Sequence, residues 1–158
     1  MNDTQLFQAL EKIIDAKTFD SLKSSIVMRD GNEYILFNKY VITNTNAVFT
    51  ITRLSDDSTY RFSSLKYAVT WITLDKCNMV YEANRVIYLD LMLTGIEASS
   101  ILYDKYLTKV LNFDSRFIYS NKIKENNIKK RNITAELDLF VRKAKNRQIK
   151  QFKQTYNK

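Results

Sequence analysis

The chain has 158 residues, of which 45% are hydrophobic and 13% aromatic, and its formal net charge is +8 at pH 7. This composition excludes a disordered chain and is typical of a protein with one folded core. Because Cys77 is the single cysteine, the chain cannot form an intramolecular disulfide. Because the chain has no His, a zinc site or a Ser-His-Asp triad would lack its usual side chain. Because the chain has no Pro and two Gly, we expect Asn, Asp and Ser to make its turns.

The first residues predict a helix. Asp3 or Thr4 can cap it, apolar residues recur at helical spacing from Leu6 to Ile14, and we expect it to end near Ala16. A second short helical turn is predicted over residues 18–25. The N-terminus lacks the basic stretch and apolar run of a secretory signal. Since no 18 apolar residues are consecutive, we expect no membrane span.

The segment from Val27 to Ser63 predicts β structure. Four runs rich in β-branched and aromatic residues are separated by Asn, Asp and Ser, and they cover residues 33–37, 40–43, 47–52 and 59–62. Asp30-Gly31 and Asn38-Lys39 fit hairpin turns. The sequence therefore predicts a small antiparallel meander of three to four strands.

A long central helix is predicted after the strands, from the caps Ser63 and Ser64 to Gly95, where the helix ends or kinks. It is apolar on most sides, so we expect several elements to cover it. Residues 96–111 resume helical spacing, and Asn112 to Ser115 predict a helix–helix corner with Asp114 as a cap candidate.

The last segment, from Arg116 to about Tyr156, predicts one helix roughly 60 Å long. Its apolar stripe fades near Val141, so we expect its first part to pack and its last part to project or to pair with a neighbouring subunit. The predicted fold class is α+β, with a small antiparallel β-meander on a long central helix, followed by a helical hairpin with a basic C-terminal helix. The expected domains are an α+β core over residues 1–95 and the hairpin over 96–158.

Positive charge is concentrated at the C-terminal end of the chain. Residues 116–158 hold 13 of the 25 Lys and Arg but three acidic residues, a local net charge of +10. Such a block favours an anionic partner. The candidate contact residues are Lys129, Lys130, Arg131, Arg142, Lys143, Lys145, Arg147, Lys150 and Lys153.

Each basic cluster also has an ordinary structural interpretation. Cations near a helix C-terminus favour the helix dipole, which one or two residues would satisfy, whereas residues 141–158 hold seven cations and no acid. For Lys129 to Arg131, ordinary surface pairing, such as Glu125 with Lys129, is the favoured interpretation.

Other chemical candidates have stronger structural explanations. The aromatic residues of the predicted sheet could stack on bases, but the segment has no net charge, so packing is favoured. Cys77 is expected to be a buried thiol. Asp75 and Glu82 are expected to pair with Arg85 rather than to act as catalytic carboxylates. We therefore expect no enzymatic activity, no metal and no cofactor.

Three stretches of the middle third resemble a family of small proteins from marine tailed bacteriophages. They are residues 33–42, residues 62–78 with the helix start Ser-Ser-x-x-x-Ala-Val-Thr-Trp, and residues 82–90. The resemblance implies a phage source and a virion or assembly setting, and it carries over no functional residue.

These observations predict a non-enzymatic phage structural or assembly protein. We expect it to dock or oligomerise through helices, with itself or other phage structural proteins. Residues 116–158 would contact DNA, RNA or an acidic protein surface. The alternative is a free nucleic-acid-binding accessory protein of the infected cell. The expected location is the host cytoplasm or the virion.

Overall fold

The computed structural model describes residues 2–14, 20, 26–29, 33–109 and 112–156, with the backbone alone for residues 3, 27–29 and 148–156. Its elements, in chain order, are α1 (Asp3–Glu11), β1 (Val27–Arg29), β2 (Glu33–Leu36), β3 (Tyr40–Thr45), β4 (Val48–Arg53), β5 (Ser58–Phe62), α3 (Leu65–Lys76), α4 (Val80–Lys109) and α5 (Phe113–Tyr156). The predicted α+β class and the antiparallel meander are confirmed, although the sheet has five strands where three to four were predicted.

The five strands form one antiparallel sheet in the order β1-β2-β3-β4-β5. Its turns use left-handed backbone at residues other than Gly. Phe37 and Asn38 have φ of 57°, and the two-residue turn between β3 and β4 has φ of 50° at Asn46 and 65° at Ala47. Asn is the residue other than Gly that tolerates this conformation best, so the predicted use of Asn in turns is confirmed. The predicted turn at Asp30-Gly31 lies outside the described residues.

Helix α1 begins one residue earlier than the predicted caps allow. Asn2 is the N-cap, and its side-chain oxygen accepts a hydrogen bond from the Gln5 backbone N–H at 2.9 Å. The Gln5 side chain accepts in return from the Asn2 backbone N–H at 3.1 Å, which completes a capping box. The helix ends at Glu11 rather than near Ala16. The short turn predicted over residues 18–25 lies, apart from Asp20, outside the described residues.

The predicted single central helix is wrong, because the chain breaks between α3 and α4. Asn78 has φ of 57°, its N–H donates to the Asp75 carbonyl at 3.0 Å, and the Met79 N–H donates to the Leu74 carbonyl at 2.9 Å. These two bonds form a Schellman motif, which ends a helix by capping its last carbonyls. At the other end of α3, Ser64 occupies the N-cap position without a side-chain cap bond.

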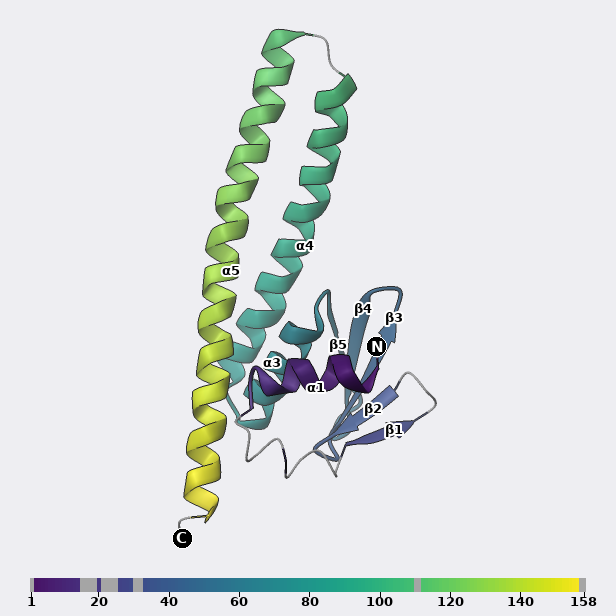
Figure 1. The fold of residues 1–158 in the computed structure, drawn as a ribbon, viewed down its shortest axis with the longest axis vertical. Coiled ribbons are helices and arrows are strands. Elements are labelled where there is room, and N and C mark those ends of the chain that lie inside the picture. The colour runs from purple at the N-terminus through teal and green to yellow at the C-terminus, as the bar shows by residue number, and fades with distance from the viewer. Residues whose placement is uncertain (1, 15–19, 21–25, 30–32, 110–111, 157–158) are drawn as a thin grey trace.

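Helices α4 and α5 form a long antiparallel hairpin that rises away from the sheet (Figure 1). Helix α4 passes through Gly95 without ending, so the predicted boundary between residues 95 and 96 falls inside one continuous helix. The Asn112 side chain, not the predicted Asp114, caps α5 by accepting from the Asp114 N–H at 2.8 Å and the Ser115 N–H at 3.4 Å.

The core lies where the sheet, α1, α3 and the lower part of the hairpin meet. Its fully buried side chains include Trp71 on α3, Ile42 on β3 and Leu89 on α4. On α5 the buried apolar residues are Ile133, Leu137, Phe140 and Ala144. The expectation that the first part of α5 packs and the part beyond Val141 reaches out is therefore wrong at Ala144. The exposed Phe113 and Phe117 instead lie in the first turns of α5, at the end of the hairpin away from the sheet (Figure 1).

Candidate anionic-partner interface

Helix α5 carries its cations outward. Every Lys and Arg of α5 up to residue 147 is exposed, and these residues are Arg116, Lys122, Lys124, Lys129, Lys130, Arg131, Arg142, Lys143, Lys145 and Arg147. The buried side chains of the helix recur at spacings of four, three and four residues from Ile133 to Ala144, which places one stripe against the core. The cations occupy the remaining surface.

The two acidic residues in the second half of α5 are paired with cations of neighbouring helices. Glu136 accepts from the Arg85 guanidinium of α4 at 2.8 Å, and Asp138 lies 3.4 Å from the Lys66 ammonium of α3. Both carboxylates are therefore neutralised by cations of the neighbouring helices. Because most of the exposed cations that the structure describes on α5 have no such partner, the exposed surface of the helix is positive overall, although Glu125 is also exposed there.

The sequence-predicted contact residues lie together on this helix. Among those whose side chains the structure describes, Lys130 alone has an ion pair, 3.4 Å from Glu97 of α4. The ammonium of Lys143 lies 5.5 Å from the centre of the Phe140 ring. The side chains of Lys150 and Lys153 fall outside the described part, although their backbone continues α5.

In the first basic cluster Lys130 makes an ordinary surface pair with Glu97. The predicted pair of Glu125 with Lys129, both within the described part of α5, is absent. Asn126, which could have contacted phosphate or base edges, is instead buried and donates to the Ser99 and Ser100 hydroxyls of α4 at 2.9 and 3.1 Å. Its amide holds the two arms of the hairpin together and is not free for a ligand.

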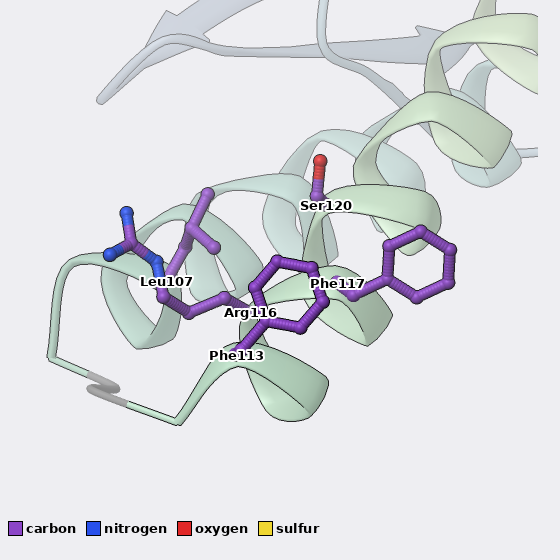
Figure 2. Close-up of a pocket in the computed structure, with 5 residues that line it drawn as sticks. All are labelled: Leu107, Phe113, Arg116, Phe117 and Ser120. Atoms are coloured by element: carbon purple, nitrogen blue, oxygen red, sulfur yellow. The ribbon is translucent and has the colours of Figure 1, made fainter.

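Arg116, at the hairpin tip, lies within the predicted contact segment 116–158 but was not among the individual residues predicted to make the contact. There Leu107 of α4 and Phe113, Arg116, Phe117 and Ser120 of α5 line an open hollow of about 430 Å³ (Figure 2). Spacing could have found this site, because Phe113 and Phe117 are four residues apart and flank Arg116. The hollow has one charged group, and it is cationic, so it extends the positive side of α5 toward the tip.

A second polar cluster lies between the sheet and α3. Arg53 of β4 donates to Asp75 at 2.7 Å and to both carboxylate oxygens of Asp56 at 3.1 and 2.8 Å. The Tyr40 hydroxyl donates to the other oxygen of Asp75 at 2.6 Å. Arg85 pairs with Glu136, so the predicted set of Asp75 and Glu82 opposite Arg85 is wrong: Asp75 belongs to a network centred on a strand residue.

The polar groups of this cluster form hydrogen bonds with one another. Burial, followed by the hydrogen bond to Asp75, raises the pKa of the Tyr40 hydroxyl well above its usual value. The Arg53 guanidinium lowers the pKa of the Asp56 carboxyl below its usual range. Tyr40 therefore stays protonated and Asp56 ionised at neutral pH. These contacts join the sheet to α3, and the same four side chains also line an open hollow of about 740 Å³.

Cys77 is buried at the C-cap of α3, and burial raises the pKa of its thiol. We expect it to react with a thiol-specific disulfide reagent at pH 8 on the order of 10²-fold more slowly in the native protein than in denaturant. The reason is that exposing the α3–α4 junction costs a few kcal/mol. The absorbance of the released reagent measures both rates. Equal rates in the two conditions would contradict the described burial.

The aromatic residues of the sheet pack inward. Tyr34, Tyr40 and Phe62 are buried, while Phe37, Phe49 and Tyr60 are partly buried against the core. The prediction that they serve packing rather than base stacking is confirmed. Within the described part of the chain, no three Asp, Glu or Cys side chains gather where a metal ion could be held.

One described helix, α4, is long and apolar enough to cross a membrane, although buried core helices meet the same criterion. Helix α5 lies along α4 and carries exposed cations such as Lys124 and Arg131, which a bilayer crossing would draw into hydrocarbon (Figure 1). This arrangement favours a different explanation for the apolar surface of α4.

Comparison with known proteins adds no family assignment: no protein-family model, curated protein or solved structure matches the chain.

Proposed function

We propose that this chain is a non-enzymatic structural or assembly protein of a tailed bacteriophage that contacts nucleic acid through the outer side of α5. The observation that carries the proposal is that two acidic residues of this helix are paired with neighbouring helices, while most of the cations that the structure describes on it are unpaired and exposed. The carboxylates of Glu136 and Asp138 are neutralised by Arg85 and Lys66, whereas cations from Lys124 to Arg147 face solvent. The phage setting rests on the resemblance of the middle third.

The shape of this surface favours nucleic acid over an acidic protein. Residues 124–147 span roughly 35 Å of one helix at about 1.5 Å per residue. Phosphates repeat at regular intervals along a duplex or a single strand, so a line of separate cations can neutralise several of them without a matched pattern. An acidic protein surface would require its carboxylates to match these positions. Binding of this kind is independent of base sequence.

The salt dependence of binding tests this proposal. For B-form DNA, the slope of log K against log salt is about −0.9 for each phosphate neutralised. The triple variant Arg131→Gln, Arg142→Gln, Lys145→Gln is therefore expected to make the slope shallower by about 2.7. Fluorescence anisotropy of a labelled duplex of about 20 base pairs, titrated between 50 and 200 mM NaCl, measures it.

A second triple variant is the matched control. Lys12→Gln, Lys39→Gln and Arg61→Gln remove the same number of exposed charges from the C-cap of α1, the β2–β3 turn and β5, and should leave most of the slope intact. Equal changes in the two triple variants would mean that net charge, not α5, attracts the DNA. A wild-type affinity that does not respond to salt would overturn the proposal.

A further inference from the structure

Helix α4 has a second apolar side that nothing covers in the described part of the chain. Its packed side includes Val86, Leu89 and Leu93. On the opposite side Tyr81, Tyr88 and Leu91 are 72%, 52% and 68% exposed. Of the exposed α4 residues from Val80 to Leu102, Glu97 alone is charged, and it pairs with Lys130 on the α5 side. An exposed apolar face of this length indicates an interface.

Side-chain size changes along this face. Its first half has the large residues Tyr81 and Tyr88, and its second half has the small residues Gly95 and Ala98 before the large Leu102. Space is open at the small end, because a methyl group built on Gly95 would meet no described atom within 4 Å outside its own helix backbone and chain neighbours. Leu91 and Met92 stand between the two halves, and both are exposed.

We propose that the uncovered side of α4 binds the same side of a second copy of this chain, with the two helices antiparallel. About a two-fold axis between Leu91 and Met92, Tyr88 of each copy faces Gly95 of the other, and Tyr81 faces Leu102. Tyr88 of each copy then fills the space over Gly95 of the other, while Tyr81 packs against Leu102, and each contact occurs twice, as in any isologous interface. A parallel pair would oppose Tyr88 to Tyr88 and Gly95 to Gly95, leaving crowding at one end and a gap at the other.

Charge supports the same partner. Between Tyr81 and Leu102 the exposed face has one charged residue, Glu97, which lies at its edge and is paired with Lys130. Pairing of two copies therefore removes no unpaired ion from water. Helix α5 lies on the packed side of α4, so the two α5 helices of a dimer stand on opposite outer sides, with their cations apart and free for phosphate. A second copy therefore covers the apolar face without blocking the proposed nucleic-acid contact. The inference rests on the proposed assembly role.

Sedimentation velocity of the full chain tests the dimer, with the matched variants Leu91→Glu and Ile101→Glu. Both residues are exposed on α4, 68% and 71% respectively, but Ile101 lies off the proposed interface. We expect the dimer dissociation constant to rise at least tenfold in Leu91→Glu and to change little in Ile101→Glu. A monomeric wild type at 100 µM chain, or equal effects of the two variants, would overturn the inference.

Salt separates this inference from the proposed function. Each copy has a net charge of +8, so screening reduces repulsion between the copies, and the dimer should hold or strengthen between 50 and 500 mM NaCl. Nucleic-acid binding should weaken over the same range. Loss of either behaviour alone identifies which proposal has failed.

Disulfide trapping tests the orientation of the pair. Met92→Cys lies beside the proposed two-fold axis, so oxidation should link two copies of this variant. Tyr81→Cys should not link to itself but should link to Leu102→Cys in a mixture. Buried Cys77 gives little background. Self-linking of Tyr81→Cys, with no link between Tyr81→Cys and Leu102→Cys, would show a parallel pair and overturn the antiparallel arrangement.

Discussion

The substitution Trp71→Ala should destabilise the folded chain by about 3–5 kcal/mol, the usual cost of removing a large aromatic side chain from a core. Trp71 is 1% exposed and lies at the centre of an aromatic cluster. Its ring centre is 4.3 Å from that of Tyr60, 6.0 Å from that of Tyr40 in an edge-on arrangement, and 6.1 Å from that of Phe62. Alanine would leave a cavity between the sheet and α3. Urea unfolding followed by circular dichroism measures the loss.

The matched variant Trp71→Phe should cost much less, under about 1.5 kcal/mol. Phenylalanine keeps most of the ring contacts and removes the indole N–H, which is buried and has no hydrogen-bond partner among the described residues. An unpaired buried donor costs about 1–3 kcal/mol, so its removal offsets part of the lost volume. If Trp71→Phe were as destabilising as Trp71→Ala, the ring contacts would not be the source of the stability.

The strands could be predicted because their signal is local. Runs such as Tyr40 to Thr43 combine β-branched and aromatic residues with bounding Asn and Asp, and a hairpin needs little more than this pattern and a turn. The observed strands differ from the predicted ones by one or two residues at most of their ends. The single C-terminal helix could also be predicted from local sequence, because its residues include neither Gly nor Pro, which would end a helix.

The break at Asn78 could not be predicted from helical periodicity, because apolar residues continue at helical spacing on both sides of it. Asn is common throughout this chain, and one Asn becomes a helix stop only when its backbone takes the left-handed conformation and its neighbours cap the helix. Gly95, the stronger local signal, ends nothing. In the proposed dimer Gly95 leaves space for Tyr88 of the other copy and makes no turn.

The candidate site was predicted in part. A count of charges located the cations of α5, but it could not show that Glu136 and Asp138 face Arg85 and Lys66, because those pairs join residues 51 and 72 positions apart. Burial of Asn126 could not be predicted from the sequence either, because its partners Ser99 and Ser100 lie on another helix. The sequence therefore located the basic helix, while the pairing of Glu136 and Asp138 depends on tertiary contacts.

The anchoring of α5 leads to an expected result for two leucines that lie two residues apart. Leu137 is fully buried, whereas Leu139 is 50% exposed on the same helix. Leu137→Ala should destabilise the chain by about 2–5 kcal/mol, because it removes a core side chain where α5 packs. Leu139→Ala should change the free energy of unfolding by no more than about 0.5 kcal/mol, as usual for a surface substitution.

The same two variants, Leu137→Ala and Leu139→Ala, are also compared in nucleic-acid binding. Neither substitution changes a charge, so below its unfolding transition Leu137→Ala should keep the wild-type slope of affinity against salt. Denaturant unfolding and anisotropy on the same preparations separate the two effects. Equal destabilisation by both variants would contradict the packed stripe on α5. A shallower salt slope in folded Leu137→Ala would instead show that the line of cations depends on core packing, because only a shift of the helix could then have moved its charges away from the phosphates.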